Sequence, residues 1–164
     1  TDHIDLLINC AGILGDMNKN LGDDLDFDEI SRVINVNAIG TLRVTNALSS
    51  LVLNSTEKTI VNISSEAGSI ADCWRTGWFG YCMSKTANNM QSALVHNNIQ
   101  KLGGKVFAIH PGHVATYMRG HLDTTAKITP DVSAEGILHV VLDMPHPINS
   151  RPLYLDYTGK ELPW

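Results

Sequence analysis

The chain lacks the features that mark several large classes of protein. No apolar run approaches the roughly 20 residues that a membrane-spanning helix needs, so we expect no membrane contact. No cluster of basic residues is present and the formal net charge is −5, which argues against nucleic acid as a partner. Cysteine is scarce, and Cys10, Cys73 and Cys82 form neither a C-x-x-C pair nor an obvious disulfide framework.

The remaining composition is that of an ordinary globular protein. Apolar residues make up 43% of the 164 residues and charged residues 18%, which is typical of a folded domain with a core of useful size. No internal repeat, low-complexity tract or linker divides the chain. We therefore expect residues 1–164 to form a single domain.

Buried strands and amphipathic helices alternate along the chain. Continuous apolar runs without period-2 alternation predict strands that are buried on both faces, at residues 4–9, 59–63, 105–109 and 153–157. Helical spacing of apolar residues predicts helices at 28–52, at 81–102 and from Ser133 to about residue 141. We expect Ser133 to cap the last helix, and Pro145 and Pro147 to end it. This order predicts an α/β fold with parallel strands and right-handed crossovers.

The most informative pattern is a tyrosine and a lysine four residues apart, Tyr81 and Lys85. At this spacing both side chains share one face of a helix. A nearby ammonium lowers the pKa of a phenol, which suits a general acid or base. Residues 60–65 read as a buried strand that ends in two serines, and the second of them, Ser65, could donate a hydrogen bond to a substrate carbonyl. Asn37 interrupts an apolar helical stripe, where a polar side chain needs a buried partner.

Five segments in this order and spacing resemble the carboxy-terminal two-thirds of a short-chain dehydrogenase/reductase. They are Asn9-Cys10-Ala11-Gly12, Asn35-Val36-Asn37-Ala38-Ile39-Gly40, Ser64-Ser65, Tyr81-Cys82-Met83-Ser84-Lys85 and Pro111-Gly112-His113-Val114-Ala115-Thr116. The long interval between Ser65 and Tyr81 contains Trp74, Trp78 and Phe79, and it resembles the C-factor or sniffer-like carbonyl reductase branch of the family. Those three aromatic residues either line the substrate entrance or pack in the core or an interface.

The resemblance implies a Rossmann-like, doubly wound parallel sheet that is truncated at its amino terminus. The family opens with a glycine-rich turn, T-G-x-x-x-G-x-G, that receives the cofactor pyrophosphate, and this chain has no such turn. We expect a partial dinucleotide-binding domain that lacks the first βαβ unit, so that the strand at 4–9 becomes an exposed edge. An engineered piece, an incomplete sequence and a short natural product all remain open. We expect a cytoplasmic protein and leave an organelle open.

The resemblance also assigns roles to the polar residues. Asn37, Ser65, Tyr81 and Lys85 match the family's catalytic tetrad, in which the lysine holds the nicotinamide ribose and depresses the tyrosine pKa. The family's asparagine organises a water that links the lysine to solvent, while the alternative for Asn37 is a plain structural amide. Ser64 is the alternative to Ser65.

Cofactor binding is expected at the strand ends. The resemblance places these residues against the nucleotide: Asn9, Ala11, Gly12, Tyr81, Lys85, Pro111, Gly112, Val114 and Thr116. It favours NADP(H), with NAD(H) possible. His110 and His113 lack the spacing of H-E-x-x-H, so we expect no metal site.

These assignments predict an NAD(P)-dependent oxidoreductase that reduces a ketone or aldehyde, or oxidises the corresponding alcohol. The alternative is a truncated, non-enzymatic family member that acts by dimerising. In either case we expect a homodimer, or a homotetramer, formed through the helices at 28–52 and 81–102.

Overall fold

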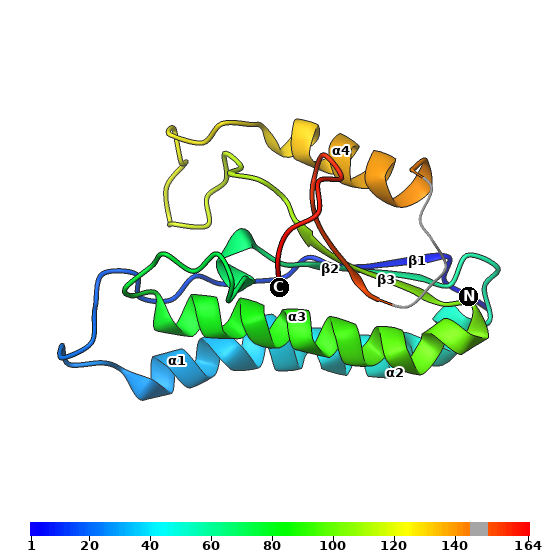
Figure 1. The fold of residues 1–164 in the computed structure, drawn as a ribbon, viewed down its shortest axis with the longest axis horizontal. Helices are drawn as coiled ribbons and strands as arrows, with labels where there is room; N and C mark the ends of the chain where they lie inside the picture. The colour runs from blue at the N-terminus through cyan, green and yellow to red at the C-terminus, as the bar shows by residue number, and fades with distance from the viewer. Residues whose placement is uncertain (145–150) are drawn as a thin grey trace.

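The computed structural model describes residues 1–144 and 151–164 of the chain. Its centre is a parallel sheet with the strand order β1-β2-β3-β4 (Figure 1). In register, Leu7 faces Ile60 and Ile60 faces Val106 across the first three strands. The strands are β1 at Leu6–Asn9, β2 at Thr59–Ile63, β3 at Lys105–His110 and β4 at Leu153–Asp156.

Helices cover both faces of the sheet. On one face lie α1 (Phe27–Ile34), α2 (Thr41–Leu53) and the long α3 (Phe79–Ile99), and on the other lies α4 (Pro130–Leu142) (Figure 1). Within the described residues, none of these helices combines the length and apolar character that a membrane span needs. The predicted Rossmann-like α/β fold, with parallel strands and helices on both faces, is confirmed.

The helix predicted at 28–52 is helical along its length but not regular. A π-helical segment at Asn35–Gly40 separates α1 from α2. Such segments insert a residue into the helical ladder and are frequent at functional sites. Here the widened turn contains Asn37, which is 1% exposed. The spacing of apolar residues in the sequence did not reveal the π-helical segment, because the apolar residues on either side of it still follow helical spacing.

The predicted start of the last helix was wrong. Thr129 is the N-cap of α4, and its hydroxyl accepts a hydrogen bond from the Val132 N–H at 3.3 Å, while Pro130 occupies the first turn. Ser133 is buried inside the first helical turns and donates to the carbonyl of Pro111 at 2.6 Å. The predicted stop at Pro145 and Pro147 lies outside the described residues.

Two apolar clusters hold the layers together. One lies between the sheet and α4, and the other lies between the sheet and the helices on the opposite face. Successive residues of β2 contribute to opposite clusters, Ile60 to one and Val61 to the other, as expected for a strand buried on both faces. The first cluster comprises Val61, Phe107, Ile109, Ile137, Val140, Val141 and Leu155, and the second Val52, Ile60, Ile99 and Val106.

The topology brings distant segments to one edge of the sheet. Because all four strands are parallel, their carboxyl ends meet at the same edge. Residues 10–12, 64–65 and 111–112 follow β1, β2 and β3 there. The strand order also places β1 at the margin of the described sheet, where Ile8 is 42% exposed.

Phe107 should contribute strongly to stability because it is 1% exposed at the centre of the cluster under α4. We expect Phe107→Ala to lower the free energy of unfolding by about 3–5 kcal/mol. Phe27 is 70% exposed and is the matched control, so Phe27→Ala should change stability by less than about 0.5 kcal/mol. Urea titrations compare the two variants, and equal losses would contradict this description of the core.

Candidate functional site

A cleft of about 630 Å³ opens at the carboxyl ends of the strands. It includes a majority of the residues that the sequence predicted for catalysis or cofactor binding. These are Gly12, Ser65, Tyr81, Lys85, Pro111, Gly112, Val114 and Thr116. These residues come from four separate stretches of the chain and line one cavity, which is large enough for a cofactor-sized ligand.

Three predicted residues lie beside this cleft rather than in its wall. The amide of Asn9 donates to the Thr45 hydroxyl at 3.0 Å and to the Asn62 carbonyl oxygen at 2.8 Å, so it ties β1 to its neighbours. The side chain of Ala11 is exposed. Asn37 is buried behind Gly12. For Asn9 the contacts indicate a role in shaping the strand end.

Asn37 joins three parts of the site. Its carbonyl oxygen accepts from the Ile13 N–H at 2.8 Å, and its Nδ2 donates to the Ile13 carbonyl at 2.8 Å and to Ser84 Oγ at 2.9 Å. The hydroxyl of Ser84 in turn donates to the Tyr81 carbonyl at 2.7 Å. The buried partners that the sequence required are thus present, and they connect the segment after β1 with helix α3.

The two serines after β2 have different environments. Ser64 is 1% exposed and its hydroxyl donates to Asn89 Oδ1 at 2.6 Å, which is a packing contact. The hydroxyl of Ser65 accepts from the Ala67 N–H at 3.2 Å and lies close enough to the phenol of Tyr81 to lower the pKa of that phenol. Buried Tyr154 fixes the Ser65 backbone, because its hydroxyl donates to the Ser65 carbonyl at 2.5 Å. These contacts favour Ser65 over Ser64 as the reactive serine.

Tyr81 and Lys85 share one face of α3, as their spacing requires. The Nζ atom of Lys85 lies 5.6 Å from the centre of the Tyr81 ring. Burial raises the pKa of Tyr81 above its ordinary value, and the hydrogen bond from Ser65 opposes this only in part. The expectation of a lowered tyrosine pKa is therefore wrong for this structure, since desolvation outweighs the favourable contacts of the phenolate.

Lys85 is almost completely buried and turned toward the strand. Its ammonium donates to the Ile63 carbonyl at 2.8 Å. Burial lowers the pKa of Lys85 to about 8, with an opposing influence from Cys10. At pH 7 the side chain is still mostly protonated, so it keeps the positive charge that a ribose hydroxyl or a phenolate would meet.

Two glycines permit close approach at the walls of the cleft. A Cβ atom on Gly12 would lie 3.4 Å from Asn37 Oδ1 and 3.7 Å from Lys85 Nζ, and would fill the space in front of the lysine. Gly112 has a φ of +86°, and a Cβ there would lie 2.7 Å from Ile128 Cδ1. The turn that contains Gly112 therefore requires glycine both for its conformation and for its packing.

A charged cluster at the cleft was not predicted from the sequence. His113 Nε2 lies 2.9 Å from Asp123 Oδ2, and Arg119 Nε lies 3.8 Å from the same oxygen. Thr125 donates to the other oxygen through its N–H and its hydroxyl, and these bonds, with His113, hold the pKa of Asp123 well below its usual range. His113 was considered only as a metal ligand, so its carboxylate partner was missed. Among the described residues, no group of three or more His, Cys, Asp or Glu could hold a metal ion.

The aromatic residues before Tyr81 do not form the cleft wall. Trp78 packs edge-on against Tyr81, with ring centres 6.3 Å apart and planes at 70°. Trp74 is 73% exposed. Of the two alternatives for these residues, the structure supports packing for Trp78 and places neither indole among the residues that line the cleft.

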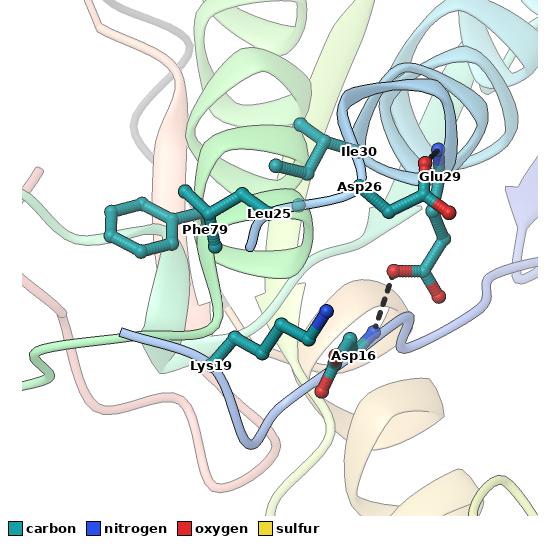
Figure 2. Close-up of a pocket in the computed structure, with 8 residues that line it drawn as sticks. Asp16, Lys19, Leu25, Asp26, Glu29, Ile30 and Phe79 are labelled. Carbon is teal, nitrogen blue, oxygen red and sulfur yellow. Dashed lines mark hydrogen bonds between the residues drawn. The ribbon is translucent and has the colours of Figure 1, made fainter. Parts of the chain in front are cut away.

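A second, much smaller pocket lies where the loop after β1 meets α1. Its volume is about 20 Å³, which is room for about one water molecule. Figure 2 shows the backbone N–H of Asp16 pointing to the Glu29 carboxylate, a hydrogen bond of 3.1 Å. Phe79 lies at the wall of this pocket and away from the cleft. We interpret this pocket as a small packing gap between the loop after β1 and helix α1.

The chain belongs to the short chain dehydrogenase family, whose model matches residues 1–127. A Myxococcus xanthus protein named C-signal is 35% identical over 164 residues, an alignment that covers 100% of this chain and 95% of that protein. The 1-hydroxy-2-glutathionyl-2-methyl-3-butene dehydrogenase of Rhodococcus sp. is 32% identical over 141 residues, or 85% of this chain and 61% of the dehydrogenase.

The fold matches a solved carbonyl reductase. The NADPH-bound carbonyl reductase from chicken fatty liver superposes with a TM-score of 0.86 at 29% identity, covering 99% of this chain and 67% of that one. The predicted family and its carbonyl reductase branch are confirmed. The chain spans about two thirds of the chicken reductase and 61% of the Rhodococcus enzyme.

Proposed function

We propose that the cleft reduces a ketone or aldehyde with a nicotinamide cofactor, or oxidises the corresponding alcohol. The observation that carries this proposal is that the Ser65 hydroxyl and the Tyr81 phenol lie close together at the wall of a cleft, with the Lys85 ammonium one turn further along α3. Two hydroxyl groups that meet in this way can both reach one carbonyl oxygen.

The roles follow from the protonation states. Because its pKa is raised, Tyr81 is protonated near neutral pH, which is the state that donates a proton to a developing alkoxide. Ser65 would stabilise that alkoxide through its hydroxyl. Positioned acid catalysis contributes roughly 10²–10⁴-fold, and a hydrogen-bond donor to the oxyanion about 10²–10³-fold. The cofactor supplies or accepts the hydride.

The walls of the cleft fit a dinucleotide. The absence of a side chain at Gly12 leaves space in front of Lys85, where ribose hydroxyls could meet the ammonium. We propose that Ala11, Gly12, Tyr81, Lys85, Pro111, Gly112, Val114 and Thr116 contact the nucleotide, and that Asn9 shapes the strand end. The NADPH bound by the chicken reductase supports NADP(H), and NAD(H) is the second candidate.

In this proposal residues 1–164 are a single domain, the part of a dinucleotide-binding fold that carries the catalytic groups. Asn37 supports them from behind, through Ile13 and Ser84. The alternative of a non-enzymatic, dimerising protein is not favoured, since that function would not require Ser65, Tyr81 and Lys85 to meet in a cleft. A cytoplasmic location stays a prediction.

Tyr81→Phe tests the proposed acid directly. The substitution removes the phenol oxygen and leaves the ring packed against Trp78. We expect kcat for carbonyl reduction to fall by about 10²-fold or more. Tyr117 is 72% exposed, and Tyr117→Phe is the matched control that should retain activity. Full reductase activity in Tyr81→Phe would overturn the assignment.

We further propose that the chain pairs with a second copy through α1–α2 and α3. These helices expose large apolar side chains, and a two-fold, self-complementary contact is the commonest way to cover such a surface. A homotetramer could form if a second interface is added. The exposed residues are Ile39, Leu42, Val44, Met83, Met90 and Leu94, each between 43% and 62% exposed.

Light scattering at micromolar concentration should therefore report a dimer or tetramer. Leu94→Arg introduces a charge within the proposed interface, since Leu94 is one of the exposed apolar residues of α3, and should give monomers. Leu21 is 86% exposed in the loop before α1 and provides the control, so Leu21→Arg should leave assembly unchanged. A monomeric wild-type protein would contradict the proposal.

A further inference from the structure

Arg75 connects the two segments that carry the proposed catalytic hydroxyls. Its Nη1 donates to Glu66 Oε2 at 3.2 Å and its Nη2 donates to Glu66 Oε1, which makes a two-pronged ion pair. Glu66 follows Ser65 directly in the chain. The Arg75 side chain is only 8% exposed, whereas that of Glu66 is 41% exposed, and the two-pronged geometry is what sets this pair apart from an ordinary surface ion pair.

The same guanidinium lies over two indole rings. Its central carbon lies 4.8 Å from the Trp78 ring centre and 4.5 Å from that of Trp74, within the range of cation–π attraction. Trp78 is the residue that packs edge-on against Tyr81. A continuous series of contacts thus runs from Glu66, next to Ser65, through Arg75 and Trp78 to Tyr81.

The backbone at Trp78 indicates that this arrangement is enforced. Trp78 precedes the first turn of α3 with φ 62° and ψ 35°, the left-handed region. A bulky residue rarely adopts this conformation and keeps it only where the surrounding contacts hold it. The Arg75 guanidinium and the Tyr81 ring both contact the Trp78 side chain. If the Arg75–Glu66 pair only anchored the loop, the left-handed backbone of Trp78 would not be needed.

We propose that Arg75 is a positioning residue for the reaction, which fixes Ser65 and Tyr81 relative to each other through Glu66 and Trp78. The inference rests on the proposed function and deepens it, because Arg75 itself is not among the residues that line the cleft. The electrostatics are consistent with this role, since the positive charge of Arg75 lowers the pKa of Tyr81 and the negative charge of Glu66 raises it.

The kinetic test uses Arg75→Lys, which keeps the charge but loses the planar fork and the stacking surface. Misplacement of the two hydroxyls weakens only the transition state, so kcat should fall by about tenfold to 100-fold while KM changes little. Arg32 forms an exposed pair with Glu29 at 4.0 Å, and Arg32→Lys is the matched control with unchanged kcat. Wild-type kcat per folded molecule in Arg75→Lys would overturn the proposal.

A second measurement needs neither cofactor nor activity. Nuclear magnetic resonance of ¹³C-labelled tyrosine, with Tyr81→Phe used to assign the signal, gives the pKa of Tyr81 in each variant. Arg75→Met should raise this pKa and Glu66→Gln should lower it, both relative to wild type. An unchanged titration in both variants would refute the contact series even if the wild-type enzyme is active. A shifted titration in an inactive wild type would instead refute the proposed function and retain the contact series.

Discussion

The buried carboxamide of Asn37 is the contact on which the rest of the site depends. It satisfies both backbone groups of Ile13 and binds Ser84, whose hydroxyl holds the Tyr81 carbonyl. Loss of the amide would leave the part-buried N–H and carbonyl of Ile13 without this partner, at a cost of up to about 1–3 kcal/mol for each. Asn37 belongs to the π-helical segment at Asn35–Gly40. We interpret the π-helical turn as the local change in the helix that lets the Asn37 amide reach both Ile13, in the loop after β1, and Ser84 on α3.

The other supports act from different directions on the same two hydroxyls. Tyr154 reaches Ser65 from β4 through a hydrogen bond to its carbonyl, and Trp78 packs against Tyr81 at the start of α3. Lys85 approaches from one turn along the helix, held by the Ile63 carbonyl at the end of β2. Tyr81 and Lys85 therefore sit on a regular helix, and Ser65, shortly after β2, is held by Tyr154, which is how catalytic geometry is made precise.

The sequence predicted the strands well because each buried strand is a continuous apolar run with clear ends. β2 at Thr59–Ile63 has the predicted bounds, and β3 extends the prediction by one residue to His110. The cleft residues could be predicted because Tyr81 and Lys85 are separated by one helical turn and Ser65 comes shortly after a buried strand. These relations are local in the chain, and a parallel sheet then brings them together.

The features that the sequence did not predict depend on contacts between distant residues or on burial. Ser133 has the composition of a cap, yet Thr129 caps α4 while Ser133 binds Pro111. The pKa of Tyr81 is raised because the folded chain buries it, which spacing to a lysine does not reveal. Arg75 and Glu66 are nine residues apart in a loop, and no periodic pattern marks their pairing.

The central claim is that Ser65 and Tyr81 act together on one carbonyl oxygen. A crystal structure of the protein with NADPH and an unreactive carbonyl compound tests it most directly. The account predicts that Ser65 Oγ and Tyr81 Oη both lie within about 3.2 Å of the carbonyl oxygen, with the nicotinamide ribose against Lys85. A carbonyl oxygen held by other groups, or a cofactor bound away from Lys85, would contradict it.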